Sequence, residues 1–419
     1  MFMRLLSYFF LICLWLSISV VPAFSGWQAV VTKDAAKLPM LVTVDKSKQF
    51  AQFFGQKASE LSSSKIPCSS GQVKGDKQRE GDKKTPEGIY FVENRRTSGL
   101  DYALYGKEAY TLNYPNPVDK LKEKDGHGIW IHGRGTPIVP RETKGCIALN
   151  NPDIADLDSK VTINTPVILA EQVAPYFKAG SDFVELKEKA QQWLAAWRNK
   201  SPDFLKMFSS EAFTKSMSES FSAFAQRKKR LFVRLPWIIT WTNNVNVLQG
   251  PDYWVTWFDQ YYRAPNLVSQ GVRRLYWQKN SAGEFVIVGM EWKERKIGIE
   301  KAYLDAIASN VHNFLDGWIK DWKNESVDAY LSRYAHNAVQ GSRRGVEAIA
   351  EHKREIWQQS KPVRIVLSDI KMSMSRRGLV VRMKQDYADS TGYADQGQKT
   401  LVLQPQGDQW VIVSEEWRS

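Results

Sequence analysis

The residues best suited to covalent chemistry are a histidine and a cysteine that lie close together in a chain with few of either. The 419 residues include five histidines and three cysteines, and thirteen residues separate His132 from Cys146. An imidazole beside a thiol lowers the thiol pKa and takes its proton, which makes the sulfur a nucleophile. The pair predicts a thiolate–imidazole site for acyl transfer. A buried structural thiol, or a disulfide between Cys68 and Cys146, is the alternative interpretation.

Glycines adjoin both residues. Gly145 precedes Cys146, and Gly133 follows His132. Glycine leaves room for a substrate to approach main-chain N–H groups, so we expect the amides of Gly145 and Cys146 to hold a developing oxyanion. Gly133 allows a backbone carbonyl to turn back and fix the imidazole tautomer.

The surrounding sequence predicts two strand ends joined by a loop. The segment "GIWIHG" alternates and ends at His132, "RGTPIVPRET" has the composition of a loop, and "KGCIAL" is again extended. Two such ends can bring two side chains together at one edge of a sheet. Further strand-like segments, including "MLVTVDKSKQFAQFF" and "EGIYFVEN", predict one core of β type over residues 26–172.

The first 25 residues have the features of a signal peptide. Arg4 precedes an apolar run, and Ala23 and Ser25 stand at the −3 and −1 positions of a cleavage site. We therefore expect export to the periplasm or cell envelope, although the run could also serve as an uncleaved membrane anchor. An oxidising compartment is also where a disulfide between the two remaining cysteines would form.

The formal net charge of +13 favours an anionic polymer as partner. Export argues against nucleic acid, and no zinc-finger or RNP-like motif is present. The sequence also has no metal-ligand spacing, Walker loop or Rossmann fingerprint, so we expect neither a metal nor another cofactor.

A repeat occupies the C-terminal half. Trp193 and Trp197 recur 125 residues later as Trp318 and Trp322, and "GEFVIVGMEWKE" recurs as "GDQWVIVSEEWRS" at the same spacing. Each unit opens with an amphipathic helix and closes with alternating strands. The pattern resembles the NTF2-like (SnoaL-like) cone fold over residues 184–297 and 305–419. The predicted fold class is α+β, with a mostly-β domain followed by two tandem cone domains.

The repeats contain no duplicated acid, base or metal cluster, so they are expected to bind or position rather than catalyse. Wall polymer, another protein, or a second copy in a dimer are the partners left open. A cluster of aromatic residues in the first repeat is interpreted either as core or as a surface that stacks on carbohydrate or peptide. The cluster comprises Trp241, Tyr253, Trp254, Trp257, Tyr261 and Tyr262.

Four blocks of the N-terminal half resemble the YkuD-type L,D-transpeptidase family. They are "VDKSKQ", "SSGQVKGDKQREGDKKTPEGIYFV", "LNYPNPVDK" and "GIWIHGRGTPIVPRETKGCIALNNPDI". The family signature is His-Gly, a spacer, then Ser/Thr-x-Gly-Cys, which falls here on His132-Gly133 and Thr143-Lys144-Gly145-Cys146. The resemblance covers about 130 residues and implies a catalytic domain over 26–172.

The resemblance implies acyl transfer on the stem peptides of peptidoglycan. Cys146 would attack the carbonyl at the L-centre of meso-diaminopimelate, expel the terminal D-alanine and hold a thioester. His132 would act as base and then as acid. An amine acceptor gives a 3–3 cross-link, whereas water gives a tripeptide.

Two departures from the family leave the outcome open. Lys144 and Ala148 stand where many members carry a histidine and an arginine, and the "YPN" and "CSSG" segments look like a branch that often hydrolyses. An L,D-carboxypeptidase of cell-shape control is therefore the alternative, and a non-catalytic wall-binding scaffold is a third hypothesis. Candidate substrate-binding residues on the active-site loop are Arg134, Arg141, Thr143 and Lys144, although solvated loop charges are an alternative interpretation of the three cations.

Overall fold

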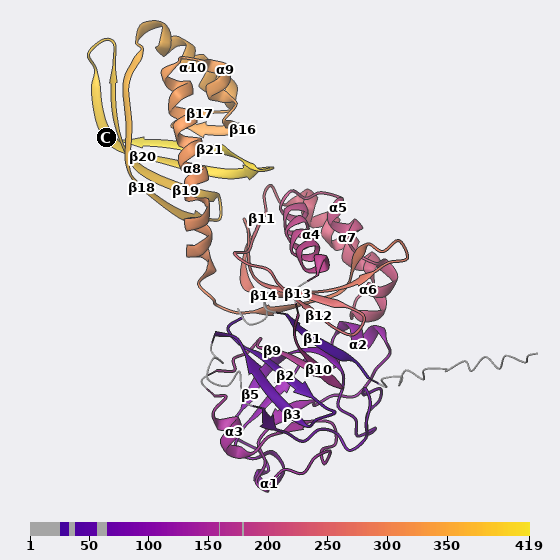
Figure 1. Cartoon of the computed structure of the whole chain (residues 1–419). Helices are drawn as coiled ribbons and strands as arrows, with labels where there is room; N and C mark the ends of the chain where they lie inside the picture. The colour runs from indigo at the N-terminus through magenta and orange to yellow at the C-terminus, as the bar shows by residue number, and fades with distance from the viewer. Residues whose placement is uncertain (1–25, 33–37, 57–64, 159, 178–179) are drawn as a thin grey trace, which may run out of the picture.

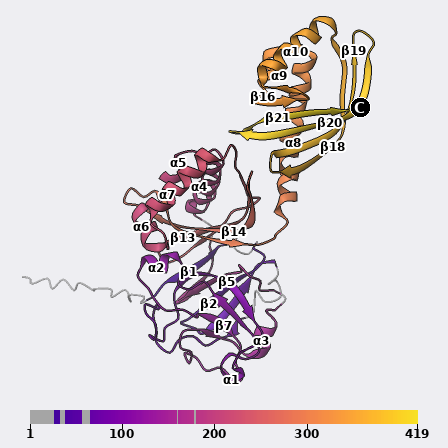
Figure 2. The same cartoon turned by 180° about the vertical axis from the view of Figure 1, so that it is seen from behind.

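The computed structural model describes residues 26–32, 38–56, 65–158, 160–177 and 180–419. The predicted signal peptide at 1–25 lies outside the described residues. Three units follow one another along the chain, and the first repeat lies between the N-terminal unit and the second repeat (Figure 1). Figure 2 shows the same order from behind. Among the described helices, none has the length and apolar character needed to cross a membrane.

The N-terminal unit is built on an eight-stranded mixed sheet. Every residue of its central strands β2 (Leu41–Asp45) and β9 (Pro166–Ala170) is buried, as expected for strands covered on both faces. A parallel pair, β1 (Gln28–Thr32) and β10 (Gln172–Phe177), lies beside it. The sheet order is β4 (Ile66–Pro67), β3 (Phe50–Phe54), β2 (Leu41–Asp45), β9 (Pro166–Ala170), β5 (Gly88–Arg96), β6 (Ala109–Leu112), β7 (Trp130–His132) and β8 (Ile147–Ala148).

Short helices of the N-terminal unit connect these strands. They are α1 (Tyr102–Tyr105), α2 (Pro117–Leu121) and α3 (Asn151–Ala155). A capping box fixes the start of α2, because the Asn116 side chain accepts from the backbone of Asp119 while the Asp119 carboxylate accepts from the amide of Asn116. This places α2 on the side of the sheet that faces the first repeat (Figure 1).

Repeat 1 packs helices against a five-stranded sheet. Its sheet follows the order β11, β13, β14, β15, with β12 pairing on β13. The elements are α4 (Ser181–Arg198), α5 (Asp203–Lys206), α6 (Ser210–Ser216), α7 (Phe221–Arg234), β11 (Ile239–Trp241), β12 (Asn246–Gln249), β13 (Trp254–Ala264), β14 (Leu267–Lys279) and β15 (Phe285–Glu294).

Repeat 2 has the same plan with a six-stranded sheet, in the order β17, β16, β21, β20, β19, β18. The predicted α+β class is confirmed. Helix α10 begins and ends 125 residues after α7. At the position where repeat 1 has helix α6, however, repeat 2 has strand β16. The elements are α8 (Ile299–Lys323), α9 (Val327–Leu331), β16 (Tyr334–Gln340), β17 (Arg343–Arg344), α10 (Val346–Gln359), β18 (Pro362–Ser375), β19 (Gly378–Asp389), β20 (Ala394–Gln406) and β21 (Gln409–Arg418).

The aromatic cluster of repeat 1 is core, as one of the two interpretations predicts. Tyr262 and Trp254 pack with the interior of the repeat, and Tyr261 and Trp241 pack against the start of α8. Tyr253 and Trp257 face the N-terminal unit instead, where they share a core with β5 and α2. The rings therefore stabilise three different contacts and do not form one stacking surface.

The N-terminal unit and repeat 1 share polar as well as apolar contacts. The Tyr253 hydroxyl accepts a hydrogen bond from the amide of Ile89 at 2.8 Å. Arg274, whose side chain is 2% exposed, pairs with Glu93 and with Glu291 at 2.9 Å each. The Pro117 side chain lies directly against Gly289, because a Cβ on Gly289 would meet Pro117 Cβ at 2.5 Å. Repeat 1 thus packs against the N-terminal unit and stabilises its sheet.

Loss of the Arg274 guanidinium is expected to destabilise this junction. Arg274→Met leaves Glu291 without this cation and Glu93 with Lys293 alone, at 2.6 Å, and breaking such a pair costs roughly 2–5 kcal/mol. Both carboxylates keep about a quarter of their side-chain surface exposed, which places the expected loss near the lower end. Denaturant unfolding measures it. Lys279→Met, which removes a more exposed ion pair to Asp182, is the control; equal losses in the two variants contradict the assignment.

Candidate active site

The sheet brings His132 and the Cys146 segment together. Strand β7 ends at His132 and pairs in parallel with β8, so that Ile131 lies opposite Ile147 and His132 opposite Ala148. Cys146 immediately precedes β8, and the amide of Leu149 donates to the His132 carbonyl at 2.8 Å. The arrangement of strand end, loop and strand end is the one that the sequence predicts.

The His132 ring is held in one orientation. Its Nδ1 lies 2.6 Å from the Gly133 carbonyl oxygen, and because that oxygen only accepts, Nδ1 carries the proton and Nε2 is left as the basic nitrogen. The Tyr105 ring packs against the imidazole with centroids 5.2 Å apart. A larger residue at 133 would force the Asn151 side chain to move, since a Cβ there would meet its Oδ1 at 2.3 Å. The sequence predicts a backbone carbonyl in this role, and the contact identifies it as that of Gly133.

The Cys146 thiol is partly exposed, and its Sγ donates to the Gly128 carbonyl at 3.4 Å. Burial raises the pKa of the thiol, although a hydrogen bond from the Trp130 backbone and the charge of Lys77 oppose the shift. Lys77 lies almost fully buried beside Asp82, at 2.8 Å. Sequence reasoning missed it, because nothing in the "GDKQREGDKK" loop distinguishes Lys77 from its neighbouring lysines.

Burial also lowers the pKa of His132, and the charge of Arg134 adds to this shift. The hydrogen bond to Gly133 opposes the shift only in part. Both shifts favour the uncharged forms, so the resting pair is a thiol and a neutral imidazole. The expectation that the imidazole lowers the thiol pKa is corrected: the low-polarity surroundings penalise both ions. Proton transfer from Cys146 to His132 then accompanies attack on the substrate.

The turn before Cys146 is held by two buried threonines. The Thr143 hydroxyl accepts from the Gly145 amide at 3.1 Å and donates to the Cys146 carbonyl at 2.7 Å. The Thr85 hydroxyl donates to the Gly145 carbonyl at 2.9 Å and accepts from the Gly71 amide. Gly145 has a φ of +131° and lies so close to Lys84 that a Cβ would meet the Lys84 carbonyl oxygen at 2.8 Å.

Two sequence expectations change as a result. The Gly145 amide is already bonded to Thr143, which leaves the Cys146 amide as the oxyanion donor of the predicted pair. Thr143 is 6% exposed, and its hydroxyl is hydrogen-bonded within the turn. This position favours a role in stabilising the nucleophile loop over contact with substrate. Thr85, which sequence reasoning did not single out, has the same role from the 81–88 loop.

The three predicted cations occupy different positions. Arg141 is tied to the N-terminal unit, with its guanidinium donating to the Lys46 carbonyl at 2.9 Å. Arg134 forms an ion pair with Glu142 at 3.0 Å. Lys144 is exposed and next to the turn. Of the three, Arg141 contributes to the scaffold, and Lys144 stays a candidate for contact with a substrate carboxylate.

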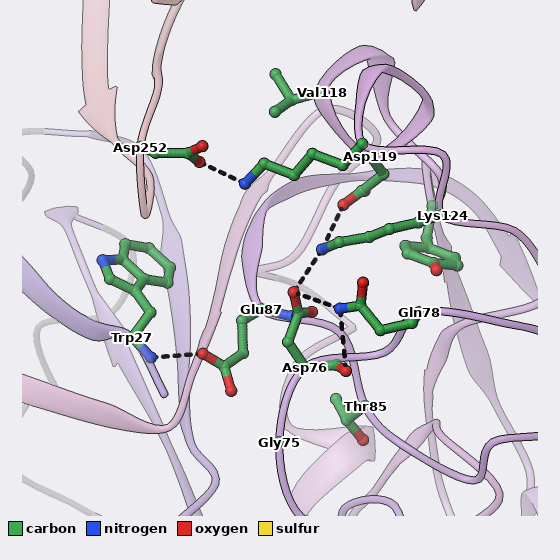
Figure 3. Close-up of polar contacts among 12 residues, drawn as sticks. Trp27, Gly75, Asp76, Gln78, Thr85, Glu87, Val118, Asp119, Lys124 and Asp252 are labelled. Atoms are coloured by element: carbon green, nitrogen blue, oxygen red, sulfur yellow. Dashed lines mark hydrogen bonds and ion pairs between the residues drawn. The ribbon is translucent and has the colours of Figure 1, made fainter. Parts of the chain in front are cut away.

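Buried charges anchor the 75–88 loop behind the turn (Figure 3). Lys124 bridges Asp76 at 2.6 Å and Asp119 at 3.1 Å, and both carboxylates and the ammonium are visible at the centre of the close-up. On the other side of the loop, Lys46 pairs with Glu87 at 2.9 Å and also donates to the Thr85 carbonyl. These bonds fix the loop segment that contains Thr85, whose hydroxyl donates to the Gly145 carbonyl.

Cys68 takes no part in the site. It is a free thiol, 2% exposed, within the apolar core of the N-terminal unit. Burial raises its pKa to about 12, with a further contribution from the Asp45 carboxylate. The alternative of a disulfide with Cys146 is therefore wrong, because the Cys68 side chain lies within the core.

Two family models match the chain. The L,D-transpeptidase catalytic domain called YkuD matches residues 39–169. The Cds6 C-terminal NTF2-like domain matches twice, over residues 185–290 and 310–416.

Among curated proteins, the putative L,D-transpeptidase YafK of Escherichia coli K12 is 31% identical over 127 residues, which is 30% of this chain and 48% of YafK. The match therefore spans about half the length of the curated relative. Among solved structures, Bd1075 of Bdellovibrio bacteriovorus is 25% identical with a TM-score of 0.49, covering 64% of this chain and 96% of that one. Pgp2 of Campylobacter jejuni, described as a helical cell shape determining protein, is 26% identical with a TM-score of 0.47, covering 60% and 91%.

The raised thiol pKa has a direct consequence for alkylation. A thiol whose pKa is raised stays protonated to higher pH. The rate of Cys146 alkylation by iodoacetamide should therefore keep rising above about pH 8.5, the ordinary pKa of a cysteine thiol. Peptide mapping by mass spectrometry follows Cys146 alone. His132→Ala should leave this pH profile in place, because burial and not the imidazole sets the thiol pKa. A rate that reaches its plateau below pH 8 contradicts the neutral resting pair.

Proposed function

The chain carries a YkuD-family L,D-transpeptidase catalytic domain followed by two Cds6-type NTF2-like domains, and we propose that it is a cysteine L,D-transpeptidase of peptidoglycan. The catalytic domain spans 26–172 and the repeats span 184–297 and 305–419. The substrate is a stem tetrapeptide, and the protein acts after export in the periplasm or cell envelope. The observation that carries the proposal is the pairing of β7 with β8, which sets His132 beside the Cys146 turn with Nε2 as its basic nitrogen.

The proposed reaction begins with proton transfer and attack. His132 Nε2 takes the Cys146 proton while Sγ bonds to the carbonyl carbon at the L-centre of the third stem residue, and the Cys146 amide donates to the oxyanion. The carbon–nitrogen bond to D-alanine then breaks, and His132 returns the proton to the leaving amine. Cys146 holds the tripeptide as a thioester until an acceptor arrives.

The acceptor decides between two products. An amine from a second stem gives a 3–3 cross-link, and His132 removes its extra proton. Water gives a tripeptide, which makes the protein an L,D-carboxypeptidase, the alternative function. What favours this alternative is Ala148: it is fully buried between Ser69 and His132, so its position offers no side chain to the substrate carboxylate.

Incubation with purified disaccharide tetrapeptide separates the candidate functions. Cross-linked dimers indicate transpeptidation, tripeptide indicates the carboxypeptidase, and an unchanged substrate indicates the non-catalytic scaffold. Chromatography of the muropeptides with mass detection reads all three results in one experiment.

Turnover is expected to depend on one cysteine. Cys146→Ala should lower the rate of tetrapeptide consumption by about 10³-fold or more, because the covalent route is lost. Cys68→Ser is the matched control and should keep most of the activity, with a stability cost from its buried position. Comparable losses in two folded variants would point to a role for Cys68 that its burial does not explain.

We further propose that the repeats position the catalytic domain on the wall rather than catalyse. A wall-binding module tethered to the catalytic domain raises the effective concentration of the site on the polymer. Repeat 1 shares a core with the catalytic domain, so removing residues 305–419 alone is the cleaner test. The shortened chain should consume soluble tetrapeptide at an unchanged rate but act more slowly on intact sacculi. Equal rates on sacculi contradict the role for repeat 2.

A further inference from the structure

A row of accessible side chains crosses the sheet and ends at the nucleophile. The register of β7 and β8, continued by one residue, places Trp130 opposite Cys146. Trp130 pairs with Thr111 of β6, and the next strand, β5, places Asn94 beside Thr111. We call these three side chains, Asn94, Thr111 and Trp130, the Trp130 row. The steps of the proposed reaction do not use them.

Strand alternation puts the Trp130 row on the same face as the thiol. Ile131 and Ile147, which follow Trp130 and Cys146 in the sequence, lie in the apolar core of the N-terminal unit. Successive side chains of a strand point to opposite faces of the sheet, so Trp130 and Cys146 point away from that core. Each member of the row is half-buried or exposed. The row is therefore accessible to a molecule that reaches the thiol.

Arg96 of β5 places a charge over this row. It belongs to the adjacent row, because it pairs with Ala109 and Ala109 pairs with His132. Its guanidinium carbon lies 5.1 Å from the centroid of the Trp130 ring. Neighbouring strands are about 4.8 Å apart, so stacking on a side chain of β7 brings the charge from β5 toward Cys146.

The Trp130 ring is itself held next to the catalytic histidine. The centroid of the Tyr105 ring lies 5.2 Å from that of Trp130 and 5.2 Å from that of His132. Tyr105 belongs to α1, which lies at the end of the N-terminal unit remote from repeat 1 in both views (Figures 1 and 2). Repeat 1 therefore leaves this part of the unit open to a ligand.

The guanidinium of Arg96 has no bonded anion. Arg96 is exposed, and within the described part of the chain it makes neither a hydrogen bond nor an ion pair. The other arginines nearby are engaged: Arg134 and Arg141 have polar partners, and Arg95, on the opposite face, pairs with two carboxylates at 2.7 and 2.5 Å. Ala148 supplies no charge. Arg96 is thus a cation on the face of the nucleophile that is free to bind a carboxylate.

We infer that the Trp130 row binds the side chain of the residue whose carbonyl Cys146 attacks, and that Arg96 pairs with a free carboxylate at the end of that side chain. The inference rests on the proposed function, in which this residue is diaminopimelate. Its side chain ends in a second centre that carries a carboxylate and an amine. Arginine binds a carboxylate through two parallel N–H bonds.

The rest of the row complements the same side chain. The Trp130 ring offers an apolar surface to its methylene groups, and the stacking holds the Arg96 guanidinium without neutralising it. The side chains of Thr111 and Asn94 make no hydrogen bond within the described residues, and their oxygens are acceptors for the amine. A side chain without the second carboxylate would leave Arg96 unpaired.

Protection of Cys146 from iodoacetamide tests the inference at the site itself. The probe is disaccharide tripeptide, which keeps the diaminopimelate side chain and has no D-alanine to lose. Arg96→Met should raise the half-protecting concentration about tenfold, the loss of one charge-assisted hydrogen-bonded pair. Arg95→Met is the matched control on the opposite face and should leave that concentration unchanged. Arg96→Lys should have an intermediate effect, because lysine keeps the charge without the paired N–H groups.

Amidated probes identify the carboxylate. Tripeptide amidated at the second centre of diaminopimelate should protect the unchanged chain as weakly as unmodified tripeptide protects Arg96→Met, and Arg96→Met should cause no further loss with it. Tripeptide amidated on its glutamate should behave like the unmodified probe. An effect of Arg96→Met that disappears with glutamate amidation instead would overturn the inference.

Two further results would also overturn it. One is an absence of protection of the unchanged chain by tripeptide, and the other is equal protection in Arg96→Met and Arg95→Met chains with native unfolding transitions. Consumption of tetrapeptide by the unchanged chain reports the proposed function separately. An unconsumed tetrapeptide together with protection that depends on Arg96 would contradict the proposed function and support the binding site.

Discussion

The parallel pairing of β7 with β8 is the constraint on which the site depends. A parallel pair cannot close through a tight hairpin, so the chain between His132 and Cys146 must form a long loop, and the loop returns at the level of the histidine. The sulfur and the imidazole therefore come from two strand ends of one sheet edge. Thr143 and Thr85 then fix the turn, and the glycine between them has the backbone freedom that the turn requires.

Burial explains both the chemistry and the support of this edge. Low-polarity surroundings keep Cys146 and His132 uncharged at rest. For the same reason, a buried ion without a partner of opposite charge is destabilising. Lys46 and Lys124 obtain theirs from the 75–88 loop, which carries Thr85 to Gly145. Arg274 of repeat 1 pairs with Glu93 of the N-terminal unit and with Glu291, and this links repeat 1 to the sheet that carries the site. Repeat 2 continues from repeat 1 through α8, and its Asp408 pairs with Arg198 of repeat 1 at 2.7 Å.

The sequence predicts the parts of the molecule whose signal is local or periodic. Strand alternation and the 125-residue offset indicate the α+β class and the two cones, and the rarity of histidine and cysteine indicates the pair. Partners distant in sequence are not predictable in this way. Nothing near Thr143 shows that its hydroxyl bonds to Gly145, and nothing near Arg274 shows that it faces Glu93, 181 residues away. The sequence left a disulfide between Cys68 and Cys146 open, because the burial of Cys68 depends on core residues that are distant in sequence.

The central claim is that Cys146 carries the acyl group. Mixing the protein with disaccharide tetrapeptide, quenching with acid within the first turnovers and mapping the cysteine peptides by mass spectrometry tests it directly. The result expected is a disaccharide-tripeptide adduct on the Cys146 peptide, absent in His132→Ala at the same time point and removed by hydroxylamine, which cleaves thioesters. Consumption of tetrapeptide with an unmodified Cys146 peptide at every early time, or an adduct on Cys68, contradicts the claim.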